Sequence, residues 1–158
     1  MAKRNVVVKP QPVHVNLSPL GFHGYASEFL RAANSFKYGG SFSPVPYYLR
    51  CHAIELALKA FLLAKGFPKN DLKFKLKHNL NRALNRATEQ GLQCEVEIKP
   101  KEKKEIKKAN VYYMGKGFEY FQVRKWAKGY PELPDLKVLA DVSSRLVSEL
   151  EDVCMRAP

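Results

Sequence analysis

The chain has 158 residues, 46% of them hydrophobic, which suits one compact domain rather than two independent ones. No apolar run is long enough to cross a bilayer, and the apolar segment after Met1 is too short for a secretory signal, so we expect a cytoplasmic protein with no membrane partner. Three cysteines at long spacings, without a Cys-x-x-Cys pair or a histidine at zinc-ligand spacing, predict reduced thiols and no metal site.

The formal net charge of +12 is unevenly distributed along the chain. Residues 65–128 hold 17 Lys and Arg residues against 7 Asp and Glu residues, whereas residues 129–158 carry a small net negative charge. A concentrated positive field attracts phosphate polymers or acidic protein partners. A solvated basic face explains the same composition, so both interpretations stay open at this point.

The positions of proline, glycine and serine residues along the chain predict one extended arm followed by helices. Residues 1–17 contain Pro10 and Pro12 and suit an extended N-terminal arm. Ser18 and Pro19 are typical of a helix start, and apolar residues then recur at helical spacing up to Gly39-Gly40. A second helix follows Pro44 and Pro46 and ends at Gly66.

The rest of the chain predicts three more helices, over residues 77–89, 101–114 and 136–154. The segment 72–77 alternates apolar and basic residues but has little to pair with, so we interpret it as a short helical or irregular entry into the third helix. With no convincing sheet, the fold class is all-α: an antiparallel up-and-down bundle of four to five helices, forming one domain over residues 18–156.

The second helix is apolar on nearly all sides, which places it at the centre of the domain. Its ionisable residues are confined to one stripe, because Tyr48, His52, Glu55 and Lys59 fall within a sector of about 60°. These side chains either face a cleft or satisfy one another in a partly buried network. Neighbouring positions on a helix surface make a network of His52, Glu55 and Lys59 physically natural.

Residues 115–134 are rich in rings and in positive charges. The rings include Phe118, Tyr120, Phe121, Trp126 and Tyr130, and the charges include Lys116, Arg124, Lys125 and Lys128. Such a segment stacks bases and neutralises phosphates in single-strand binders. The alternative, which we favour, is that the rings close one end of the bundle.

The sequence His52-Ala53-Ile54-Glu55-Leu56-Ala57-Leu58-Lys59-Ala60, followed by Gly66 and then His78-Asn79-Leu80, resembles the HEPN family. The resemblance extends over residues 18–154. It implies a four- or five-helix bundle that is often a homodimer, in proteins linked to RNA cleavage, nucleotide binding, toxin-antitoxin pairs and phage defence.

The nuclease branch of that family carries an arginine, four to six arbitrary residues and then a histidine. None of His14, His23, His52 or His78 has an arginine at that spacing. Where relatives often show His-Asp-Leu, this chain has His78-Asn79-Leu80, so a carboxylate is also missing. The ribonuclease role therefore does not transfer residue by residue, and no glycine-rich phosphate loop or other cofactor motif appears.

Two hypotheses about function follow. In the first, a noncatalytic module binds RNA, nucleotide or an acidic protein, in a defence or toxin-antitoxin setting. Its binding residues would be Lys73, Lys75, Lys77, Arg82, Arg86, Lys116, Arg124, Lys125 and Trp126. In the second, the chain is a divergent metal-independent ribonuclease whose cleft, at a homodimer interface, is lined by His52, Glu55, Lys59 and His78. We favour the first, with the polar stripe as a structural network.

Overall fold

The computed structural model describes residues 14–40, 42–120 and 129–157, and within these ranges it contains helices and no strands. The longer helices are α1 (Pro19–Ser35), α2 (Val45–Ala64), α4 (Leu80–Glu89), α5 (Pro100–Met114) and α7 (Leu136–Glu149). Shorter pieces are α3 (Lys69–Asp71), the π-helical turn η1 (Leu72–Leu76), the 3-10 turn η2 (Leu92–Cys94) and α8 (Glu151–Met155). The all-α prediction is confirmed.

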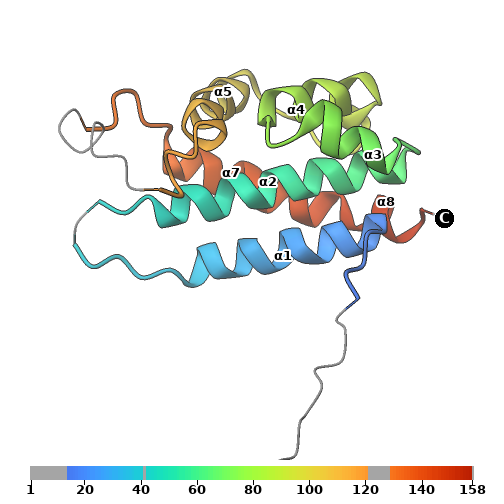
Figure 1. Ribbon diagram of the computed structural model, residues 1–158, viewed down its shortest axis with the longest axis horizontal. Helices are drawn as coiled ribbons and strands as arrows, with labels where there is room; N and C mark the ends of the chain where they lie inside the picture. The colour runs from blue at the N-terminus through green and yellow to red at the C-terminus, as the bar shows by residue number, and fades with distance from the viewer. Residues whose placement is uncertain (1–13, 41, 121–128, 158) are drawn as a thin grey trace, which may run out of the picture.

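Helix α2 is the centre of the domain, as its composition predicts. It contacts α1, α4, α5, α7 and α8, with α1 running antiparallel beside it and α4 and α5 lying on the side away from α1 (Figure 1). Ile54, Leu58 and Phe61 of α2 are fully buried, together with Ile106 of α5 and Leu139 of α7. The remaining elements therefore surround the apolar faces of a single helix.

Four of the predicted helix boundaries are wrong. Helix α2 begins at Val45, so Pro46 lies in its first turn rather than before it. The first helix ends at Ser35 rather than near Gly39: Phe36 adopts an extended conformation, and residues 37–40 are all exposed, so little burial is available to stabilise another turn. Helix α4 begins at Leu80 rather than Lys77, because Lys77 has a positive φ of 51°. The last helix is interrupted at Leu150, which separates α7 from α8.

The segment 72–76 forms a π-helical turn, which confirms the prediction of a short helical entry. Leu72 and Leu76 are buried, whereas Lys73, Phe74 and Lys75 between them are exposed. The backbone N–H of Lys77 donates to the carbonyl of Leu72 at 3.0 Å and closes the turn. The alternation of apolar and basic residues therefore reflects a single widened turn with two anchoring leucines.

The described part of the aromatic segment packs against the start of α2. The ring of Phe118 stacks on Tyr47 at 5.3 Å between centroids and lies 5.3 Å from the ring of Tyr112. The Tyr130 hydroxyl donates to the carbonyl of Gly117 at 3.1 Å. These rings close one end of the helical domain, while Phe121 and Trp126 lie outside the described residues.

Candidate functional site

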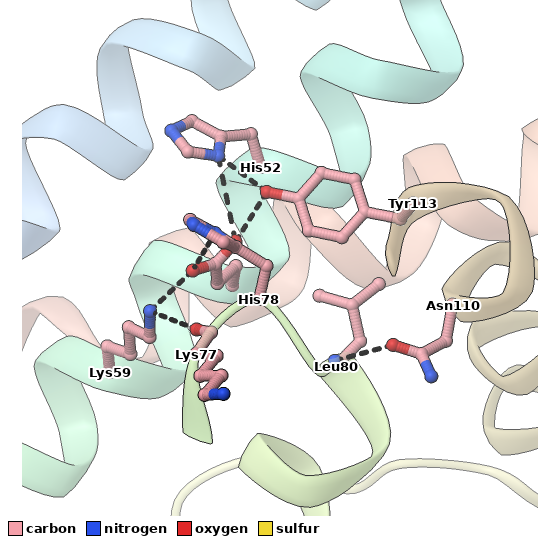
Figure 2. A network of polar contacts seen from close by, with 8 residues as sticks. His52, Lys59, Lys77, His78, Leu80, Asn110 and Tyr113 are labelled. Carbon is pink, nitrogen blue, oxygen red and sulfur yellow. Dashed lines mark hydrogen bonds and ion pairs between the residues drawn. The ribbon is translucent and has the colours of Figure 1, made fainter. Parts of the chain in front are cut away.

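A cluster of polar side chains converges on the carboxylate of Glu55 (Figure 2). Lys59 Nζ donates to Glu55 Oε1 at 2.5 Å, the Tyr113 hydroxyl donates to Oε2, and His78 Nδ1 lies 3.1 Å from Oε1 and 3.2 Å from Oε2. His52 Nδ1 lies 2.6 Å from the Tyr113 hydroxyl and 3.7 Å from Glu55 Oε2. The structure thus brings together the four candidate residues from the sequence, three on α2 and one after η1, and adds Tyr113. We call these five side chains the Glu55 network.

The Glu55 carboxyl is only 1% exposed, yet it is ionised. Burial alone raises the pKa of this carboxyl, but the nearby His52 ring and the donors Lys59 and Tyr113 together outweigh burial and lower the pKa to about 2. Burial and the adjacent Glu55 charge raise the pKa of Tyr113, so that its hydroxyl keeps the proton it donates.

These protonation states place a proton on Nδ1 of both histidines. A carboxylate only accepts hydrogen bonds, so His78 Nδ1 carries a proton toward Glu55. The Tyr113 hydroxyl gives its own proton to Glu55, so its oxygen accepts from His52 Nδ1. The His78 side chain is 68% exposed and its Nε2 has no hydrogen bond to the described chain, so this nitrogen faces solvent.

The Glu55 network connects three parts of the fold. Glu55 and Lys59 belong to α2, Tyr113 belongs to α5, and Lys59 Nζ also donates to the carbonyl of Lys77 at 2.6 Å. The connection after η1 is held a second time by Asn110 Oδ1, which accepts from the backbone N–H of Leu80 at 2.7 Å. Lys77 has φ 51° and ψ −125°, a rarely populated backbone conformation that these contacts maintain.

A half-open groove of about 570 Å³ lies beside this connection. Its apolar lining comes from residues at the start of α1 and in η1, and its cations come from α2, α3, η1 and the connection to α4. The lining residues are Leu17, Phe22, Leu72 and Phe74, with Lys59, Lys69, Asn70, Lys73, Lys77 and His78. Lys69, Lys73 and Lys77 form no ion pair with any described carboxylate. The groove therefore combines apolar walls with uncompensated positive charge.

The predicted basic residues fall into separate groups. Lys73, Lys75, Lys77, Arg82 and Arg86 are all exposed along η1, the following connection and α4; we call them the basic surface, in which Lys73 and Lys77 line one groove and Lys75, Arg82 and Arg86 line a second. Lys75 pairs with Asp71 and Arg86 with Glu89, each at 2.7 Å.

Lys116 belongs to a different region of the molecule. Its neighbour Phe118 packs on Tyr47, whereas Lys77 contacts Lys59, which lies about 18 Å further along α2. Lys116 lies over the ring of Tyr120 at 5.4 Å and does not extend the basic surface. Arg124, Lys125 and Trp126 lie outside the described residues.

The sequence-based site missed three side chains that the structure brings to the network or the groove. Tyr113, Lys69 and Phe74 were not among the candidate site residues. The sequence holds one signal for Phe74, which stands between Lys73 and Lys75. Lysines on both sides are typical of an exposed turn, and the Phe74 ring is indeed exposed.

Two further classes of site find no support in the part of the chain described. No group of three His, Cys, Asp or Glu side chains is placed to hold a metal ion within residues 14–40, 42–120 and 129–157. Among the same residues, no helix combines the length and the hydropathy that crossing a membrane requires. Cys51 and Cys154 are buried and Cys94 is exposed, all three as free thiols.

Comparison of the chain with protein-family models, with curated proteins and with solved structures finds no match in any of the three.

Proposed function

We propose that this chain is a noncatalytic, HEPN-like module that binds RNA or nucleotide phosphates on its basic surface. The observation that carries the proposal is that five exposed cations lie along η1, the following connection and α4, and that among the described ion pairs only Lys75 and Arg86 of the five have a carboxylate partner. Phosphate groups bind such surfaces by releasing counterions, without needing a shaped pocket. An acidic protein would be attracted by the same charge and is the competing partner.

The Glu55 network supports a structural role for the polar stripe. Glu55, Lys59 and Tyr113 are buried. Lys59 and Tyr113 donate hydrogen bonds to the Glu55 carboxylate, and Lys59 also donates to a backbone carbonyl. Groups engaged in this way hold elements together and have little freedom to act on a substrate. The HEPN resemblance points the same way, because the Arg-to-His spacing of the nuclease branch is missing from the sequence.

One observation favours the divergent metal-independent ribonuclease as a second candidate. His78 is exposed, and the Glu55 carboxylate fixes its Nδ1–H tautomer and leaves Nε2 free to accept a proton. This is the arrangement of a general base supported by a carboxylate. Such an enzyme would cleave RNA at a rate that depends on His78.

The test is fluorescence anisotropy with a labelled single-stranded RNA at increasing KCl concentration. We expect binding at low salt and a loss of affinity as salt rises. Replacing Lys73, Lys77 and Arg82 together with Gln is expected to reduce the salt slope by about 0.7 for each phosphate that the variant no longer neutralises. The matched control replaces three exposed cations elsewhere, Lys37, Lys137 and Arg156, with Gln.

Equal weakening by the two triple variants, or no retention of RNA at low salt, overturns the proposal. Incubation of the same RNA with protein separates the two candidate functions: cleavage that is lost in His78→Gln establishes the ribonuclease. The homodimer and the toxin-antitoxin or defence setting belong to the HEPN part of the proposal. Light scattering and the neighbouring genes test them.

A further inference from the structure

The groove beside η1 exposes apolar surface that no other part of the described chain covers. Phe74 is 65% exposed and Leu17 is 49% exposed, and both line the groove together with Phe22 and Leu72. Its volume of about 570 Å³ lies in the range of sites that enclose small organic ligands. Covering this surface with an apolar group is favourable, because it removes the rings and aliphatic chains from water.

The charges around the groove are of one sign. Lys69, Lys73, Lys77 and His78 line it, and none of the three lysines forms an ion pair with a described carboxylate. The neighbouring acids are already occupied: Asp71 pairs with Lys75, and Glu55 is buried beneath Lys59. A ligand with an anionic head group is therefore attracted, and one with a cationic head group is repelled.

We propose that this groove binds a small amphipathic anion, with an apolar chain or ring against Phe22, Leu72 and Phe74 and a carboxylate or phosphate head among Lys69, Lys73 and His78. The proposal goes beyond RNA binding, because it assigns a separate ligand to an apolar site. Lys73 belongs to both sites, but this ligand also requires Phe74 and Lys69, neither of which belongs to the basic surface.

Lys59 takes no part in holding the head group. Its ammonium donates to Glu55 and to the carbonyl of Lys77, so it serves as the floor of the groove. Lys73 is placed toward the aromatic wall, with its Nζ 5.4 Å from the centre of the Phe74 ring. The head and the apolar body of one ligand would thus meet adjacent residues of η1.

Isothermal titration calorimetry with dodecanoate, below its critical micelle concentration, tests the proposal on the full chain. Dodecanol and dodecyltrimethylammonium serve as neutral and cationic amphiphiles with the same chain. We expect one dodecanoate per chain, about tenfold weaker binding of dodecanol and no binding of the cation. Absence of dodecanoate binding, or equal binding of all three amphiphiles, overturns the proposal.

Two pairs of variants locate the site. Phe74→Ser is expected to weaken dodecanoate binding about tenfold, whereas Val111→Ser, which removes an apolar side chain of similar exposure (68%) from α5, leaves it unchanged. Lys69→Gln weakens binding, and Lys103→Gln does not. Phe74→Ser leaves RNA anisotropy unchanged, so the two proposals fail separately. Equal effects within either pair place the amphiphile elsewhere and overturn the assignment.

Discussion

Replacing Glu55 with Gln removes the charge on which the buried network depends. The side chain keeps its shape, but Lys59 loses its ionic partner and remains buried. A carboxyl pKa lowered from 4.5 to about 2 corresponds to about 3 kcal/mol of folding free energy. Breaking one side of a buried ion pair costs a similar amount, about 3–5 kcal/mol. We therefore expect Glu55→Gln to lower the free energy of unfolding by about 3 kcal/mol near neutral pH.

The pH dependence of this loss identifies its cause. Because the folded-state pKa of Glu55 is depressed, its stabilising contribution is fully present above about pH 4.5 and is lost as the pH falls toward 2. Urea unfolding followed by circular dichroism is expected to show the difference between wild type and Glu55→Gln falling to about half at about pH 3. The wild type loses this stability on acidification, whereas the variant has no charge at this position to lose.

Two controls separate the network from general effects. Glu149→Gln removes an exposed carboxylate on α7 and is expected to change stability by less than about 0.5 kcal/mol. Glu55→Leu combined with Lys59→Met removes both buried charges and is expected to recover most of the loss. A difference for Glu55→Gln that is below about 1 kcal/mol, or that stays constant between neutral and acidic pH, would refute the reasoning.

Three further predictions concern the backbone around the site. Gly21→Ala drives a Cβ into the carbonyl oxygen of Asn16, so thermal unfolding should show a lower midpoint, whereas Gly24→Ala in the same helix meets nothing within 4 Å and should not lower it. Lys77→Gly relieves a positive φ and should raise the free energy of urea unfolding by up to about 1 kcal/mol. Asn110→Ala leaves the first amide of α4 without its acceptor and should lower that free energy by about 1–3 kcal/mol.

Local spacing along one helix predicted part of the candidate site. Glu55 and Lys59 are four residues apart on α2, and the structure places them in direct contact, as the helical period requires. His78 was predicted from its sequence context, and it joins the network from the connection before α4. The role of Tyr113 was not predicted, because its partner is 58 residues away and a tyrosine on a helix has the same pattern as a core residue.

The groove could not be predicted from the sequence, for a different physical reason. It exists only where the start of α1 packs near η1, and the sequence does not indicate which distant elements meet. The sequence does not indicate the positive φ of Lys77 either, because lysine favours a helix and tertiary contacts impose the turn. Both features depend on packing between elements, whereas the all-α class and the central place of α2 follow from periodicity along the chain.

The Glu55 network and the groove meet at the connection between η1 and α4. Some residues there belong to the network alone, some to the groove alone, and some to both. Lys59 contacts Glu55 and the Lys77 carbonyl, so it fixes the backbone from which the side chains of Lys77 and His78 project. Lys69 and Phe74 contribute only to the groove. A change at Glu55 should therefore act first on stability, and a change at Lys69 or Phe74 on ligand affinity alone. His78 belongs to both, because its Nδ1 is bound to Glu55 while its exposed ring lines the groove.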